Sequence, residues 1–194
     1  MTYKTHLTIG LLFSSVIFLL IYKIELSPAL AVILILSTGL GSSTPDLDTP
    51  SGGLWKKVPA GSIISRIVNP IFIGGHRHLS HSFIGFGIFT FLFWLLIKLI
   101  APNLPMIHNS EFIILAAFGL GYASHLLADM FTEAGVPLLF PLEYHFGIPP
   151  DPLGKIRIKT GRWFENLIIY PLVNIALLLV LYLYLKENFN LFGL

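Results

Sequence analysis

The run of apolar residues from Phe112 to Phe131 limits the possible folds more than any other part of the chain. It is long enough to cross the hydrocarbon core of a bilayer as one helix, which takes about 20 residues. Four more apolar runs occur, at Leu7–Tyr22, Ala29–Leu40, Phe83–Ile100 and Leu167–Leu185. Only 11% of the residues are charged, against about 25% in ordinary globular domains, and the mean hydropathy is +0.80. We therefore expect a single all-α, multi-pass membrane domain over residues 1–194, with about five transmembrane helices and cytoplasmic loops.

Basic residues are concentrated on one side of these expected helices. The connections over residues 42–82 and 132–166 carry Lys56, Lys57, Arg66, Arg77, Lys155, Arg157, Lys159 and Arg162. The other side has only Lys23 and Lys186, with Lys98 near a helix end. Short loops rich in Lys and Arg stay on the cytoplasmic side. We therefore expect the N-terminus and both long loops on the cytoplasmic side of the cell membrane and the C-terminus on the opposite side.

His125 and Asp129 lie within the Phe112–Phe131 run, four residues apart, so a helix projects both from one face. Gly121, one turn earlier on that face, leaves space for another helix or a ligand. Ionisable residues within a membrane span are costly and usually mark a functional site. An imidazole and a carboxylate in this arrangement can bind one metal ion. The alternative is a buried hydrogen bond that holds two helices together.

More candidate ligands lie at the cytoplasmic ends of the other expected helices. They are His6, Asp46, Asp48, His76 and His81. Together with His125 and Asp129 they share one depth on one side of the membrane, which scattered core histidines would not do. Cysteine is absent, so any ion must be held by nitrogen and oxygen ligands.

Asp46 and Asp48 follow Pro45, which should end the preceding helix. In an extended segment alternate residues face the same way, so both carboxylates can reach one site. The alternative is a turn with two solvated aspartates. A carboxylate is electrostatically unfavourable at a helix C-terminus, which weakens that alternative.

The segment from Gly75 to Ser82 combines histidines with a fixed cation. If a helix begins near Gly75, Arg77 and His81 share a face, and Arg77 can bind a phosphate or a developing anion. Ser80 and Ser82 can cap a helix or orient an imidazole. The alternative is a solvated, histidine-rich helix start, and His78 in particular can simply face water.

Glu165 is the strongest site candidate among the acidic residues of the last cytoplasmic loop, because it lies at the entry to the fifth expected helix. An ordinary interfacial salt bridge explains it equally well. Gly135–Pro141, in the same loop, is apolar but too short to cross the membrane, so we expect it to lie on or dip into the bilayer.

Five motifs occur in order along the chain. They are Met-Thr-x-x-x-His6, Pro45-Asp-Leu-Asp48, Gly75-His-Arg-x-x-Ser-His81-Ser, Gly121-Tyr-x-Ser-His125-x-x-x-Asp129 and Gly135-Val-Pro-Leu-Leu-Phe-Pro141. The chain resembles, over almost its whole length, the metal-dependent hydrolases of the YdjM type, also known as LexA-binding, inner-membrane-associated proteins. Typical members are expected to have Gly in place of His78 and Thr in place of Ser80, which argues against His78 as a ligand. A weaker similarity is to zinc-dependent phospholipase C proteins.

The resemblance implies a hydrolase, and the residues suggest how it would work. We expect a divalent metal, Zn²⁺ or Mn²⁺ in one or two ions, at a cytoplasm-facing site. Arg77 would neutralise charge on a phosphoryl or acyl group, and whichever of Asp46 and Asp48 is not a ligand would act as general base. The interfacial position favours a lipid-like phosphoester substrate, and direct nucleic-acid binding is not expected.

Two other functional classes remain open from the sequence. A metal transporter or sensor would need ligands near the bilayer midplane and a path to both faces, which the one-sided clustering disfavours. A non-catalytic membrane protein would use the same His/Asp network only to hold its helices together. The oligomeric state is open.

Overall fold

The computed structural model describes residues 1–48, 78–142 and 144–189, together with Trp55, Gly61, Ile63 and Ser65. The stretch Ile63–Ile73, which contains Arg66, predicts an interfacial helix. It lies almost entirely outside the described residues, so the helix stays a prediction. His76 and Arg77 also lie outside them.

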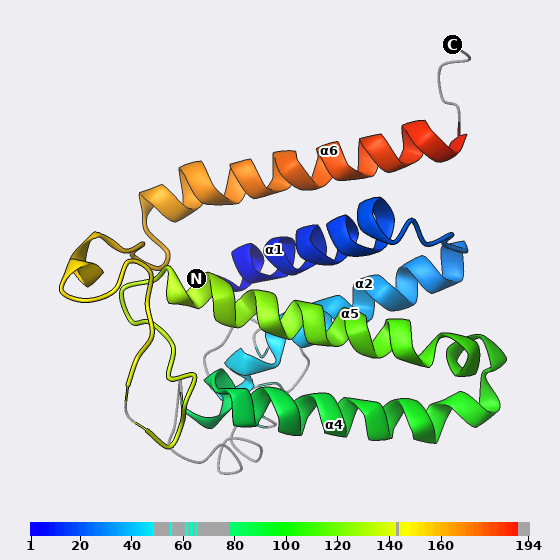
Figure 1. Ribbon diagram of the computed structural model, residues 1–194, viewed down its shortest axis with the longest axis horizontal. Helices are drawn as coiled ribbons and strands as arrows, with labels where there is room; N and C mark the ends of the chain where they lie inside the picture. Colours follow the sequence, from blue (N-terminus) through cyan, green and yellow to red (C-terminus); the bar gives the residue numbers. More distant parts are fainter. Residues whose placement is uncertain are drawn as a thin grey trace.

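Regular structure in the described residues is helical, which confirms the predicted fold class (Figure 1). The main helices are α1 (Tyr3–Ser15), α2 (Pro28–Ser43), α4 (Phe83–Ile100), α5 (Pro105–Met130) and α6 (Tyr170–Phe189). A π-helical turn, Val16–Ile21, continues α1, and another, Glu165–Ile169, precedes α6. The described residues contain no β-strand, only two isolated β-bridges, Thr132 with Ile158 and Val136 with Phe146.

Within the described residues, four helical stretches are long and apolar enough to cross a membrane: Tyr3–Ile21, Phe83–Asn103, Pro105–Met130 and Glu165–Asn188. The fifth expected span is α2, a shorter apolar helix of 16 residues. At 1.5 Å per residue it is about 24 Å long, somewhat less than the roughly 30 Å hydrocarbon core.

Local sequence signals explain most of the helix boundaries. The Ser27 hydroxyl accepts a hydrogen bond from the Leu30 amide at 3.2 Å, and Pro28 occupies the first turn of α2. Ser82 caps α4 in the same way, accepting from the Gly85 amide at 3.0 Å, as predicted. The sequence between Ile100 and Glu111 predicts a short turn over Ala101–Ser110, and this prediction is wrong in its second half. α5 begins at Pro105, because proline tolerates the first helical turn, where no amide donor is needed.

α1, α2 and α5 form the centre of the bundle, with α4 packed on α5 and α6 on α1 (Figure 1). The most extensive contact joins α2 and α5, and glycines allow it. A Cβ atom at Gly121 would lie 2.2 Å from the Thr38 carbonyl oxygen, and one at Gly41 would lie 2.0 Å from that of Phe118. Close approach through small residues is typical of membrane helices. Gly121 thus makes room for a helix, one of the two possibilities that its position suggested.

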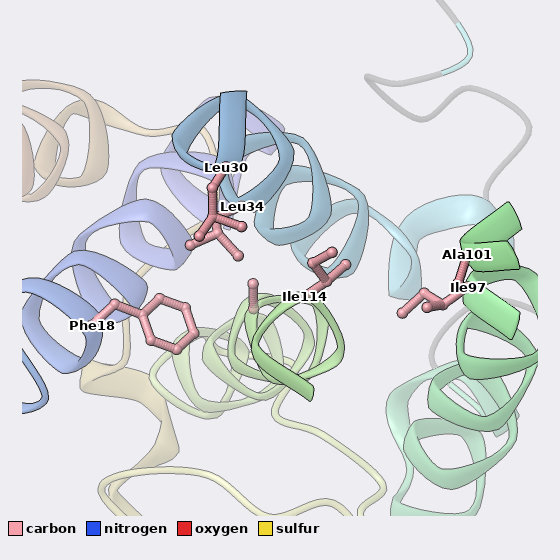
Figure 2. Packing of buried hydrophobic residues seen from close by; sticks show 7 residues of the cluster. Phe18, Leu30, Leu34, Ile97, Ala101 and Ile114 are labelled. Atoms are coloured by element: carbon pink, nitrogen blue, oxygen red, sulfur yellow. The ribbon is translucent and has the colours of Figure 1, made fainter. Parts of the chain in front are cut away.

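The two ends of the bundle differ in character. Buried apolar side chains, including Phe18, Leu34 and Ile114, fill the end where α1 finishes and α2 begins (Figure 2). The start of α1, the end of α2, the start of α4 and the end of α5 meet at the other end (Figure 1). This second end holds the buried polar residues.

The connection between α5 and α6 packs beside this polar end. Val136 is fully buried and exchanges backbone hydrogen bonds with Phe146. The Phe83 amide at the start of α4 donates to the Leu138 carbonyl at 3.0 Å. The apolar Gly135–Pro141 patch therefore covers the start of α4, while its Leu139 side chain remains exposed.

Candidate metal centre

Imidazole and carboxylate groups from four segments converge at the polar end of the bundle. His6 comes from α1, Asp46 from the turn after α2, His81 from the turn before α4, and His125 and Asp129 from α5. All are buried except Asp46, whose side chain is 21% exposed. The predicted clustering of these five residues is therefore present in the structure.

The His125 imidazole is held by the backbone of α2. Its Nδ1 donates to the Ser42 carbonyl oxygen at 2.7 Å. Because a carbonyl can only accept, the proton is on Nδ1, and Nε2 carries the free lone pair. Nε2 lies 3.7 Å from Oδ1 of Asp46 and 3.9 Å from Oδ2 of Asp129. A backbone partner behind a histidine is the usual arrangement in metal sites, since it fixes both the tautomer and the ring orientation.

His81 is oriented through a serine. The Ser80 hydroxyl donates to Oδ2 of Asp48 at 2.5 Å, so its oxygen is available to accept from Nδ1 of His81 at 3.0 Å. This arrangement leaves Nε2 of His81 to face Oδ2 of Asp129 at 3.7 Å and Oδ1 of Asp46 at 3.9 Å. The Tyr122 hydroxyl also holds this turn, because it donates a hydrogen bond to the Ser80 carbonyl at 2.5 Å. Of the two roles that the sequence suggested for Ser80, helix cap or support of an imidazole, its hydrogen bonds fit the second.

The segment with Asp46 and Asp48 is a 3₁₀ turn, Pro45–Asp48, and not the extended strand that we expected. With three residues per turn, residues two apart do not share a face. The two carboxylates therefore reach His81 from different sides. Asp46 faces Nε2, whereas Asp48 lies behind the ring, 3.7 Å from Nδ1. Asp46 is therefore a candidate metal ligand, whereas Asp48 lies behind a candidate ligand, His81.

His6 and Asp129 complete the cluster. Nε2 of His6 lies 3.2 Å from Oδ1 of Asp129, and the His6 ring stacks on that of His125, with centroids 3.6 Å apart and planes within 9°. The Met1 amino group also contacts Oδ1 of Asp129. Asp129 therefore presents Oδ1 to His6 and Oδ2 to His81 and His125.

These residues form two overlapping groups that can hold a metal ion: His6, Asp46 and His125, and His81, His125 and Asp129. Within each group the ligand atoms lie within 4.8 Å of one another. Ligands about 2.1 Å from a tetrahedral ion are about 3.4 Å apart, close to the 3.7 to 3.9 Å that separate Nε2 of His81 or His125 from the carboxylate oxygens within these groups. Because Nδ1 of His125 is engaged by Ser42, only one nitrogen of the shared residue is available to a metal.

Unpaired buried nitrogens also fit a metal ligand set. Neither ring nitrogen of His6, nor Nε2 of His125, has a hydrogen-bond partner within the described part of the chain. Buried polar atoms are normally hydrogen-bonded, and an orphaned one is costly. A divalent cation would satisfy Nε2 of His125 and one ring nitrogen of His6. Imidazole with carboxylate suits zinc, and manganese accepts the same donors.

Two residues that the sequence singled out lie elsewhere. His78 is half-buried, with its ring edge-on to Phe140 at 6.1 Å, and it belongs to neither group. Glu165 is fully buried and accepts hydrogen bonds from Thr2, Thr5 and Gly161, which is neither of the two roles that the sequence suggested, a site residue or an interfacial salt bridge.

Comparison with known proteins assigns most of the chain to one family of membrane proteins. The family described as "YdjM inner membrane protein" matches residues 1–189. "Inner membrane protein YdjM" of Escherichia coli (strain K12) is 34% identical over 153 residues, covering 77% of this chain and 70% of that protein. "Uncharacterized protein YvsG" of Bacillus subtilis (strain 168) is 30% identical over 138 residues, covering 71% of this chain and 72% of that protein. No solved structure matches. The chain belongs to the YdjM family of inner membrane proteins.

Proposed function

We propose that this membrane protein is a metal-dependent hydrolase. Its centre consists of His6, Asp46, His81, His125 and Asp129. The main support is the convergence of two imidazole Nε2 atoms, each oriented from behind by a hydrogen bond at Nδ1, on the Asp46 and Asp129 carboxylates. A purely structural histidine would more commonly use both nitrogens in hydrogen bonds, whereas Nε2 of His125 has no hydrogen-bond partner among the described residues.

The residues of the centre have different roles in the proposed reaction. A divalent ion, Zn²⁺ or Mn²⁺, supplies the Lewis acidity for hydrolysis when it is bound. His81 and His125 donate neutral nitrogen, and Asp129 supplies negative charge from a buried position. Asp46 is the one partly exposed member, so substrate and water approach from its side, where its carboxylate can accept a proton. Asp48 orients His81 through Ser80. One ion is favoured over two, because both groups depend on the same His125 nitrogen.

The place of the centre in the bundle suggests the class of substrate. The cluster lies at one end of the apolar helices, where the edge of a bilayer would meet water. A lipid-like phosphoester can present its polar group there, and Arg77 is our candidate for neutralising its charge. From the distribution of Lys and Arg, we assign the centre and the N-terminus to the cytoplasmic side and the C-terminus to the opposite side.

Elemental analysis of the detergent-purified protein tests the proposed centre. Wild type should carry about one equivalent of zinc or manganese, Asp129→Asn should lose it, and Glu187→Gln should keep it. Glu187 is a matched control, since it is an exposed carboxylate paired with Lys23 on the opposite end of the bundle. Wild type that takes up no metal, even when metal is added back, would show that the His/Asp network only holds helices together. Metal without turnover of any phospholipid or lipid phosphomonoester would count against the hydrolase.

A further inference from the structure

Glu165 is a buried carboxylate outside the candidate metal centre, and each of its oxygens has a partner. Oε1 accepts from the Thr2 amide at 2.6 Å and from the Thr2 and Thr5 hydroxyls at 2.7 Å each. Oε2 accepts from the Gly161 amide at 2.7 Å. The side chain is 0% exposed. Glu165 therefore acts as a fixed anchor, and its partners show what it holds.

Most of those partners belong to the first turn of α1. Thr2 is the N-cap residue of this helix, and its own side chain makes no capping hydrogen bond to the helix amides. Glu165 supplies a cap from another segment, and a carboxylate is electrostatically favourable at a helix N-terminus. Thr5 immediately precedes His6, so the anchored turn is the one that carries the His6 imidazole to Asp129.

The anchor also joins α6 to the bundle near the candidate centre. Most of α6 presents apolar side chains outward, but at this end Lys4 lies over the Tyr170 ring, with Nζ 4.5 Å from its centroid. Glu165 begins the π-helical turn before α6, and such turns often occur at functional positions. The contacts of Glu165 and Tyr170 thus determine where the first turn of α1 lies.

We propose that Glu165 is a positioning residue for the candidate metal centre, holding the first turn of α1 so that His6 reaches Asp129. This inference rests on the proposed function for its effect on metal binding. It adds to that function a residue that touches neither the metal nor any of its candidate ligands.

Metal titration of the purified protein tests this role, with Zn²⁺ or Mn²⁺ alone as the ligand. Glu165→Ala should raise the Kd by about 10- to 100-fold, the usual effect of removing a residue that supports a metal ligand without binding the metal. Glu165→Gln keeps one acceptor oxygen, so its effect should be smaller, and Glu187→Ala should leave the Kd unchanged. In a His6→Ala background, Glu165→Ala should cause no further loss. Independent, additive effects of the two substitutions would overturn the proposal.

Labelling of histidines with diethylpyrocarbonate, read by peptide mass spectrometry, gives a second readout that needs no metal. His6 is buried in the wild type, so Glu165→Ala should speed the labelling of His6 while His81 stays protected. Equal labelling of His6 in both proteins, or faster labelling of every buried histidine, would refute a positioning role. If Glu165→Ala does not fold, Glu165→Gln takes its place. Failure of wild type to bind metal would reject the proposed function alone, and the labelling would still decide the role of Glu165.

Discussion

Gly121→Ala should disrupt the candidate metal centre without touching any of its side chains. The added Cβ atom would lie 2.2 Å from the Thr38 carbonyl oxygen and 2.9 Å from the Ser42 amide nitrogen. Both contacts are with backbone atoms, so no side-chain rotation relieves them. α2 must move away from α5 by about 1 Å to restore van der Waals separation. Overpacking of this kind costs about 1–3 kcal/mol.

The same displacement acts on the hydrogen bond that orients His125. Its Nδ1 now lies 2.7 Å from the Ser42 carbonyl, and a shift of about 1 Å takes the pair beyond hydrogen-bond range. We therefore expect Gly121→Ala to lower the midpoint of thermal unfolding in detergent and to weaken metal binding by about 10-fold or more.

Gly87→Ala is the matched control. Gly87 also lies within a membrane-spanning helix, but a Cβ atom there meets nothing within 4 Å. This substitution should leave both the unfolding midpoint and the metal affinity unchanged. A Gly121→Ala protein with wild-type stability and wild-type affinity would refute the idea that close packing of α2 and α5 sets the position of His125.

Three further substitutions separate orientation of ligands from stability of the fold. Ser80→Ala should weaken metal binding by about 10-fold, measured by titration, because it removes the link between His81 and Asp48; unchanged affinity would contradict the link. Ser82→Ala should lower the free energy of unfolding by about 1 kcal/mol through loss of the α4 cap while leaving metal affinity intact. Tyr122→Phe removes the hydrogen bond to the Ser80 carbonyl and should cost about 1–2 kcal/mol in denaturant unfolding; a more stable protein would argue that this bond does not hold the turn.

The parts of the fold that depend on local pattern could be predicted from the sequence. The limits of α4, Phe83 and Ile100, match the apolar run residue for residue, because a serine cap and the end of the run coincide with the helix ends. The sequence also predicts that His6, His125 and Asp129 lie at the same end of the bundle. Successive membrane-spanning helices run in opposite directions, so the start of the first and the end of the fourth are on the same side. The position of Gly121, one turn before His125, predicts that another helix or a ligand comes close to the backbone there.

The parts that depend on contacts between distant segments could not be predicted. The motif Pro-Asp-Leu-Asp is compatible with an extended strand or a 3₁₀ turn, and only the position of Ser80 decides that Asp48 lies behind His81. Glu165 is separated by more than 150 residues from Thr2 and Thr5, and nothing in its own neighbourhood indicates that these hydroxyls will surround it. The sequence suggests only a site residue or an interfacial salt bridge for such a position, because hydroxyl and amide partners from distant segments leave no local pattern.

The buried polar groups at this end of the bundle are of two kinds, and the difference bears on function. Both oxygens of Glu165 are occupied by four short hydrogen bonds, as expected for a group that serves the fold. The ring nitrogens of His6 and Nε2 of His125 are equally buried but make no hydrogen bond within the described residues. An interior that pairs one carboxylate completely would not be expected to leave these imidazole nitrogens without hydrogen bonds beside the Asp129 carboxylate unless a further group binds there. Their position against Asp46 and Asp129 makes a cation the group that would satisfy both the lone pairs and the negative charge.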